Sequence, residues 1–233
     1  MSELDPAAGQ TYIQALALGL APDWRRRSDA ERHEDGSAFA AAVDRLDDAG
    51  GRTISYSSIG LEAGVDILLW RMAPSVDALE ESAAAILRTG LGRWLTVSHS
   101  FVGRIGPSQY VRKPTEQEQS LFAGERSRYL VVYPFTKSTD WYLLSREARQ
   151  GVMNEHMRVG HDYPTIRQAL AYSFGLDSQE FVVAYEMDDL VAFGDLVRAL
   201  RSTESRRSTV SDTPILLGIH RPVPEILALL GAA

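Results

Sequence analysis

The sequence predicts an α+β protein made of two fused ferredoxin-like repeats whose sheets pair into a barrel. Two stretches of the chain, residues 56–87 and 172–200, resemble each other. Each contains Tyr-Ser, a Gly-Leu turn followed by an acidic residue, an apolar run and an amphipathic helix pattern. This internal repeat is the first observation behind the prediction, and the order of the flanking elements is the second.

The flanking patterns extend the repeat in both directions. Residues 11–19 and 128–136 are predicted strands, and residues 28–47 and 145–159 are predicted helices. After each copy comes a further predicted strand, near residues 94–102 and 213–220. Each half therefore follows the order β-α-β-β-α-β. Ser75 and Asp189 stand at corresponding positions as predicted caps of the last helix in each half.

A sheet with helices on one face must bury its other face, which two such halves can do against each other. We expect an N-terminal half over residues 1–110, a connector over 111–127 and a C-terminal half over 128–233 that carries the functional site. An alternative is two separate domains with exposed sheets. The apolar runs Asp66–Trp70 and Phe181–Tyr185 favour the fused pair.

Composition excludes several classes of function. The net charge of −7 argues against a nucleic-acid partner, which usually meets a basic face. The chain has no cysteine, so disulfides, thiolate catalysis and cysteine-ligated clusters are excluded. We see no secretory leader and no apolar run long enough to span a membrane. A cytoplasmic protein that does not bind membranes is expected.

The five histidines differ in their surroundings. His33 lies in a charged segment, while His99 and His220 lie in or after strands, where hydrogen-bonded structural roles are typical. His156 and His161 are five residues apart, which does not align them on one face of a helix and makes a two-histidine metal site weak. His156 lies inside a predicted helix, where a histidine taken alone is more often structural than a ligand.

The strand before that helix places unusual side chains on one face. Side chains alternate along a strand, so one face carries Tyr129, Val131, Tyr133, Phe135 and Lys137. A phenol, large apolar groups and a cation form a plausible wall for a flat apolar ligand with acidic edges, such as a porphyrin. The alternative is an ordinary barrel core with the Lys137 ammonium extending to solvent at its rim.

Four segments resemble the chlorite dismutase superfamily. They are Tyr129–Leu144, the pair Glu155-His156, the sequence SFGLDSQEF and the closing GIHRP. The resemblance runs from about Tyr12 to Leu230 and lies nearest to the coproheme decarboxylase branch. It implies a dimeric α+β barrel type of fold, a homo-oligomer in the form of a ring of five subunits, and a bound iron porphyrin.

The resemblance also assigns roles to residues. His156 is implied as the axial ligand of the iron, with Glu204 as a candidate hydrogen-bond partner. The alternative for Glu204 is an exposed acid near basic neighbours. The decarboxylase motif Tyr-Pro-x-x-Lys matches Tyr133 to Lys137, which implies that Tyr133 supplies an electron and a proton while Lys137 holds a propionate. Chlorite dismutases carry an aliphatic residue in place of Tyr133. Trp141 is a candidate second aromatic for the wall of the cofactor site or for electron transfer, with an ordinary place in the aromatic core as the alternative.

A distal residue separates the two chemistries as well. Chlorite dismutases carry an arginine seven residues before the glycine of the Gly-Leu-Asp turn, where many decarboxylases carry glutamine. Here that position is Gln168, although a slip of one residue would place Arg167 there. Some decarboxylases use a histidine in the connector, and this connector offers Arg112 and Lys113 instead.

Taken together, these features predict a decarboxylase that converts iron coproporphyrin III (coproheme) to haem b with hydrogen peroxide as oxidant. Tyr133, Lys137 and Gln168 are its predicted catalytic residues. A chlorite dismutase, which makes chloride and dioxygen, and a haem-binding protein without activity are the alternatives. Arg128 and Arg201 are further candidates for propionate contacts, without a predicted place.

Overall fold

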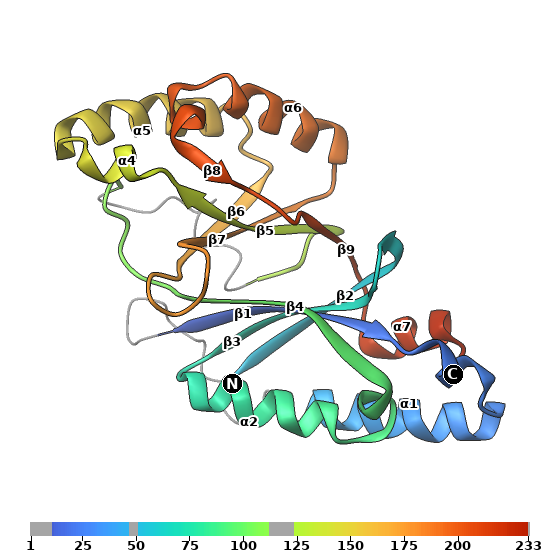
Figure 1. The fold of residues 1–233 in the computed structure, drawn as a ribbon. Coiled ribbons are helices and arrows are strands. Elements are labelled where there is room, and N and C mark those ends of the chain that lie inside the picture. The colour runs from blue at the N-terminus through green and yellow to red at the C-terminus, as the bar shows by residue number, and fades with distance from the viewer. Residues whose placement is uncertain (1–10, 47–50, 112–123, 233) are drawn as a thin grey trace. The chain divides into compact units, whose positions relative to one another are not determined.

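The computed structural model describes residues 11–46, 51–111 and 124–232. The chain divides into two compact units. The first contains the chain up to Ile105 together with Leu216–Ala233, and the second contains Gly106–Ile215. Each combines an antiparallel sheet with helices (Figure 1), so the predicted α+β class is confirmed. The pairing of the two sheets into one barrel stays a prediction.

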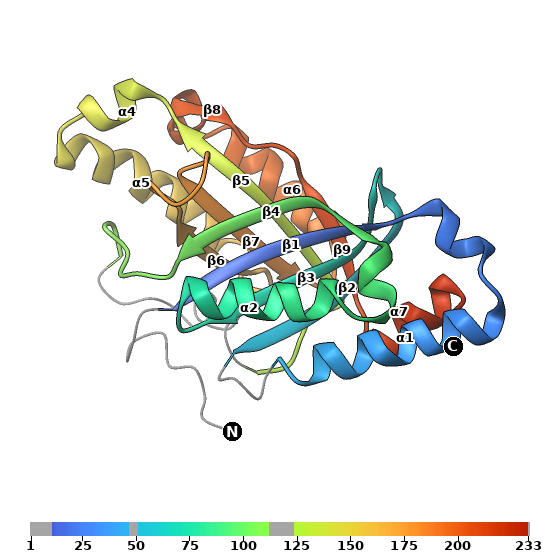
Figure 2. The same ribbon diagram turned by 60° about the horizontal axis from the view of Figure 1, so that its bottom comes forward.

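The first unit follows the predicted order of elements. Its sheet has the strand order β4-β1-β3-β2-β9, with every neighbouring pair antiparallel. Helices α1 and α2 lie side by side on one face of this sheet (Figures 1 and 2). The elements are β1 (Tyr12–Leu20), η1 (Pro22–Arg26), α1 (Asp29–Asp44), β2 (Arg52–Glu62), β3 (Val65–Ala73), α2 (Val76–Leu87), η3 (Gly90–Trp94), β4 (Leu95–Arg104), β9 (Leu216–His220) and α7 (Val223–Leu230).

The second unit repeats the arrangement with a shorter last strand. Its sheet has the order β6-β7-β5-β8, again antiparallel throughout. Helices α5 and α6 lie side by side on one face of this sheet. The elements are β5 (Tyr129–Lys137), α4 (Thr139–Leu143), α5 (Arg146–His161), β6 (Arg167–Tyr172), β7 (Phe181–Met187), α6 (Leu190–Arg201), η4 (Glu204–Ser208) and β8 (Thr209–Ser211).

The predicted strand near residues 213–220 is placed differently by the structure. The fourth strand of the second sheet is the short β8, whereas β9 pairs with β2 of the first unit. Side chains hold it there, because the Ser58 hydroxyl donates to the carbonyl of Leu217 at 2.8 Å. Gly218 packs directly on Tyr56, where a Cβ would come within 2.6 Å of the tyrosine side chain. The repeat therefore ends earlier than its pattern suggested.

Local sequence explains where the helices begin. Ser28 and Glu31 form a capping box at the start of α1. The predicted caps are both confirmed: Ser75 accepts from the amide of Ala78, and Asp189 accepts from the amides at the start of α6. These bonds replace partners that the first amides of a helix lack.

Apolar side chains fill the space between the first sheet and its helices. This core draws on β1, β3, α1, α2 and α7, so the C-terminal helix closes it. Its fully buried members include Leu18, Trp24, Phe39 and Leu69. No helix in the described part of the chain is long and apolar enough to cross a membrane.

The cap of α6 can be tested directly. Replacement of Asp189 by Ala removes two hydrogen bonds from backbone amides, at 2.8 Å and 3.1 Å. We expect the free energy of unfolding to fall by about 1 kcal/mol. Chemical denaturation of both proteins measures this. Asp189→Asn keeps a capping oxygen and is the matched control, so an equal loss in both variants would contradict the capping role.

Candidate functional site

The second sheet presents the predicted site residues on the face that α5 and α6 cover. Directly opposed residues of antiparallel strands point to the same side. Tyr185 of β7 lies opposite both Val131 of β5 and Gln168 of β6. Two residues along the same strands, and so on the same face, Tyr133 lies opposite Val183. Gln168 and Tyr133 therefore share one face, as the alternation along β5 predicted.

Lys137, at the end of β5, is buried rather than extended to solvent. Lys137 is 8% exposed. Its ammonium donates to the carbonyl and the hydroxyl of Ser205, both at 3.0 Å, and to the hydroxyl of Thr209 at 3.3 Å. Burial lowers the Lys137 pKa to about 8, with a further contribution from Arg206. The alternative, in which the Lys137 ammonium extends to solvent at the rim, is thus wrong, because η4 and Thr209 supply oxygens that replace water.

Aromatic rings complete the surroundings of this ammonium. Trp141 of α4 is 3% exposed, and its ring centroid lies 4.8 Å from the Lys137 nitrogen, within the range of a cation–π contact. Tyr110 packs edge-on against Trp141, with ring centroids 6.4 Å apart. Trp141 therefore lies beside Lys137, and its place in the wall of a cofactor site stays a prediction.

His156 lies on α5 with a neutral imidazole. Burial lowers its pKa to about 4, with the Lys137 cation as the second cause and Glu155 opposing both. Its Nδ1 atom is buried and has no hydrogen-bond partner among the described residues. A neutral, unsatisfied ring nitrogen is the form in which histidine binds metal ions.

Glu204 does not take the place that the resemblance implied. Its carboxylate pairs with Arg207 at 3.3 Å on an exposed surface. Its backbone amide instead donates to the carboxylate of Glu155 at 2.9 Å, which ties η4 to α5. The predicted bond from Glu204 to His156 is thus absent from this structure, and Glu155 is the acidic residue that influences the imidazole.

Gln168 and Arg167, the two candidates for the distal position, are consecutive residues of β6 and therefore point to opposite faces of the sheet. Arg167 bonds to Glu186 at 2.8 Å, and the Glu186 carboxylate is completely buried on the other side of the sheet. Arg126 approaches the same carboxylate at 3.5 Å. This buried ion pair fixes the register of β6, so Gln168 is the residue that faces α5 and α6.

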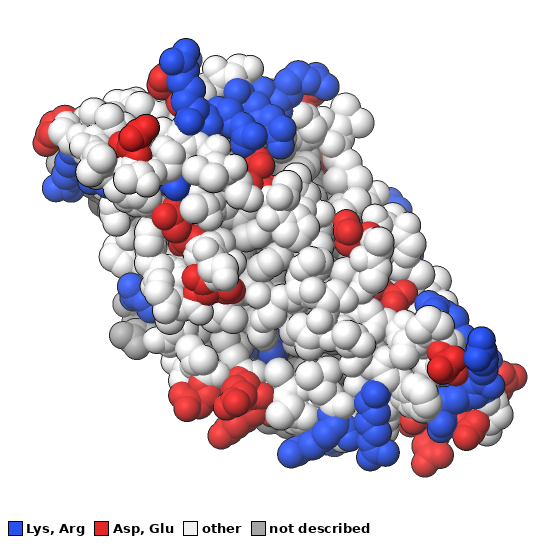
Figure 3. Space-filling view, viewed as in Figure 1, with Lys and Arg blue, Asp and Glu red and all other residues white. Residues whose placement is uncertain are grey.

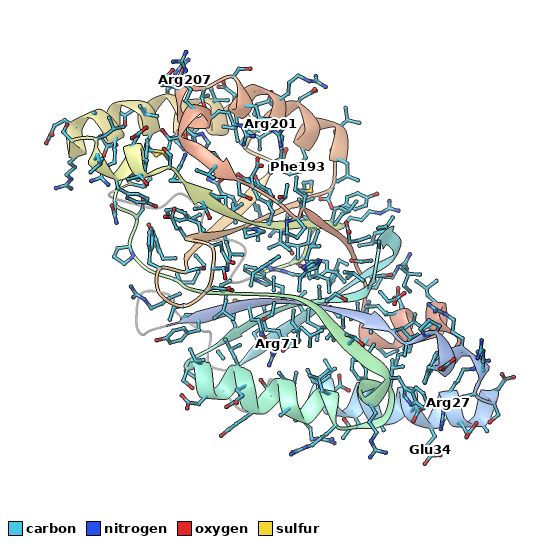
Figure 4. All side chains as sticks on the ribbon, in the orientation of Figure 1. Arg27, Glu34, Arg71, Phe193, Arg201 and Arg207 are labelled. Carbon is cyan, nitrogen blue, oxygen red and sulfur yellow. The ribbon has the colours of Figure 1, made fainter. Side chains whose placement is uncertain are left out.

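A basic cluster borders this face, and sequence reasoning identified only part of it. Arg206 and Arg201 both contact one carboxylate oxygen of Asp212, at 2.7 Å and 3.4 Å. Figure 3 shows Lys and Arg side chains gathered over α6 and η4, and Figure 4 places Arg201 and Arg207 there. The run of basic residues after α6 was a visible signal, but nothing in it indicated which ones face inward.

Tyr133 lies close to these charges. Burial is the main cause that raises the pKa of its hydroxyl far above the usual range, followed by Tyr185 and Asp212, while Arg201 opposes them. The phenol therefore stays protonated at any physiological pH. Arg112 and Lys113, which were noted in the connector, lie outside the described residues.

Comparison with known proteins gives a consistent result. The family model described as "Chlorite dismutase" matches residues 32–221. A coproheme decarboxylase of Mycolicibacterium smegmatis is 33% identical over 177 residues, which cover 75% of each chain. A chlorite dismutase variant from Candidatus Nitrospira defluvii superposes with a TM-score of 0.87 at 26% identity, over 95% of both chains. The same enzyme in complex with imidazole gives 0.86 at 27% identity and equal coverage.

The neutral imidazole of His156 predicts a pH dependence of stability. Because its folded pKa of about 4 lies below the ordinary 6.5, the unfolded chain binds the additional proton between these values. Stability of the metal-free protein should therefore fall as the pH drops from 7 to 4, by up to about 3 kcal/mol. Denaturation of wild type and His156→Gln at both pH values measures this, and a loss of equal size in both would refute it.

Proposed function

The chain belongs to the chlorite dismutase family, and on this premise we propose that it is a haem-dependent decarboxylase of iron coproporphyrin III. Hydrogen peroxide is the proposed oxidant and haem b the product. The observation that carries the proposal is the arrangement of Tyr133 and Lys137 on the face covered by α5, on which His156 lies. The similarity to a coproheme decarboxylase supports the same reaction.

The donor set of this face fits an iron porphyrin. His156 offers a neutral imidazole with an unsatisfied nitrogen, which would hold the iron of a bound porphyrin. Aromatic and aliphatic side chains on the same strands suit the macrocycle, and the cations of η4 suit its propionates. When bound, the iron porphyrin would supply the activation of hydrogen peroxide.

The remaining chemistry falls to residues of this chain. Each propionate arm, with one hydrogen peroxide and one proton, gives a vinyl group, one carbon dioxide and two waters. Tyr133 would provide an electron and a proton from its phenol, which its raised pKa keeps protonated until that moment. Lys137 would hold the carboxylate, exchanging its longest bond, to Thr209, for a charge-assisted one.

Gln168 favours this reaction over chlorite chemistry. Its amide is neutral, so it would stabilise negative charge near the iron less than an arginine would. The nearest arginine in the strand, Arg167, is held on the opposite face by Glu186. Chlorite dismutation is the second candidate because the solved relatives are chlorite dismutases.

We also propose that the protein forms a homo-oligomer of five subunits. Analytical ultracentrifugation measures the mass of the assembly and so tests this.

The proposed reaction has a direct assay. Protein loaded with iron coproporphyrin III is titrated with hydrogen peroxide, and the porphyrin is followed by mass spectrometry. We expect two successive losses of a carboxyl group, ending at haem b. Unchanged porphyrin would exclude the decarboxylase, and sustained dioxygen release on addition of chlorite to haem-loaded protein would establish the second candidate instead.

Tyr133→Phe tests the phenol within the same assay. It removes one oxygen and keeps the ring, so we expect the Soret band to stay while decarboxylation slows by more than about a hundredfold. Tyr56→Phe, which removes a buried hydroxyl from the first unit, is the matched control and should retain full activity. Haem b formation by Tyr133→Phe at the wild-type rate would remove Tyr133 from the mechanism.

Lys137→Met tests the ammonium while preserving an apolar side chain of similar length. Loss of a charge-assisted bond to the substrate should lower kcat/KM about ten- to a hundredfold. Thermal unfolding of the variant provides the control for folding, since Lys137 also bonds to Ser205 and Thr209. Unaltered kinetics in a folded Lys137→Met protein would show that another cation holds the carboxylate.

A further inference from the structure

The carboxylate of Glu180 lies next to the site but takes no part in the proposed chemistry. Glu180 is the last residue of the loop between β6 and β7. Its backbone is bonded on both sides: its carbonyl accepts from the amide of Ser173 at 2.8 Å, and its amide donates to the carbonyl of Phe135 at 3.3 Å. The side chain of Glu180 therefore starts from a fixed point near the end of β5.

One oxygen of this carboxylate accepts two hydrogen bonds. The amide of Lys137 donates to Oε2 at 2.7 Å, and the hydroxyl of Tyr142 in α4 donates to the same atom at 2.5 Å. The pairing of β5 with β7 ends at Phe135, so the Lys137 amide lies beyond the strand that would supply its acceptor. The Glu180 carboxylate replaces that acceptor, and bonds to a charged oxygen are stronger than those to a neutral one.

The bond from Tyr142 extends this link into α4. The helix has only five residues, and so short a helix is marginal without tertiary contacts. The Tyr142 ring also packs edge-on against Phe174 of the same loop, with centroids 6.0 Å apart. The preceding residue, Trp141, has its ring over the Lys137 ammonium. Glu180 is thus bonded to Lys137 itself and to the neighbour of Trp141, the two partners of the cation–π contact.

The two ends of the Lys137 side chain are therefore held by different elements. Ser205 and Thr209 accept bonds from the ammonium, whereas Glu180 accepts from the backbone amide. An ammonium that exchanges one of its bonds for a substrate carboxylate keeps its direction only if the backbone below it stays in place. Catalytic groups depend on such fixed geometry, because small displacements lower the rate strongly.

We propose that Glu180 is a positioning residue, which holds the backbone of Lys137 against the ring of Trp141 so that the ammonium meets the substrate carboxylate in one orientation. The effect on catalysis rests on the proposed function, which assigns that carboxylate to Lys137. The dependence of the Lys137–Trp141 contact on Glu180 is a property of the protein without cofactor. The negative charge of Glu180 also opposes the lowering of the Lys137 pKa by burial and by Arg206.

The contact is tested without cofactor by fluorine NMR of protein labelled with 5-fluorotryptophan. The chain has four tryptophans, and Trp141→Phe identifies the resonance of Trp141. We expect Glu180→Ala to shift this resonance and to leave that of Trp70, in the first unit, unchanged. Glu180→Gln keeps an acceptor oxygen, so its shift should be smaller. An unshifted Trp141 resonance in Glu180→Ala, or an equal shift in Glu180→Gln, would overturn the proposal.

Two further variants make this test independent of the stability of Glu180→Ala. Tyr142→Phe removes one of the two bonds and keeps the ring on Phe174, so it should shift the Trp141 resonance in the same direction. Asp195→Ala removes an exposed carboxylate of α6 that pairs with Arg198, and it is the control that should leave all four resonances in place. A Trp141 shift of the same size in Asp195→Ala would show a general effect of charge and overturn the proposal.

The catalytic effect is tested with iron coproporphyrin III and hydrogen peroxide. We expect Glu180→Ala to lower kcat/KM about three- to tenfold, as for one lost hydrogen bond. In the Lys137→Met background, which has no ammonium to orient, the same change should have no further effect. Equal losses in both backgrounds would overturn the positioning role. If wild type itself leaves the porphyrin unchanged, the proposed function fails, and the fluorine spectra alone decide whether Glu180 holds the contact.

Discussion

The ammonium group of Lys137 is buried among three oxygens of Ser205 and Thr209 and lies over the ring of Trp141. A cation removed from water is tolerated only where polar groups replace the lost hydration. The turn η4 must therefore stay against the end of β5, and Glu155 holds the same turn against α5 through the amide of Glu204. Burial keeps the imidazole of His156 neutral by lowering its pKa, and the Lys137 cation lowers that pKa further. One buried charge thus links the strand, the turn and the helix that form the site.

In the first unit, the positions that correspond to Tyr133, Lys137 and His156 carry apolar side chains. Leu16 and Leu20 of β1 occupy the strand positions that Tyr133 and Lys137 occupy in β5. Phe39 lies as far beyond the cap of α1 as His156 lies beyond the cap of α5. These three apolar residues belong to the packed core of the first unit. One copy of the repeat is therefore filled with side chains, whereas the other carries the polar groups of the candidate site.

Much of the site could be predicted because it follows strand alternation. The shared face of Tyr133 and Lys137 depends only on the period of two residues along β5. The sequence favoured Gln168 but left a slip to Arg167 open, and which of the two faces α5 and α6 depends on the pairing of Arg167 with Glu186 across the sheet. The implied bond from Glu204 to His156 is not made for a similar reason, because the Glu204 side chain pairs with Arg207 and only its amide reaches α5.

The sequence by itself determined the repeat, the starts of the capped helices, the α+β class and the likeness to chlorite dismutases and coproheme decarboxylases. These features are encoded locally, in periodicity, capping residues and short motifs. The tertiary structure decided that β9 joins the first sheet, which oxygens surround Lys137, and that the ring of Tyr185 lies beside that of Tyr133. Each of these contacts joins residues distant in the chain, and no local pattern records which distant group will satisfy a buried charge or hydroxyl.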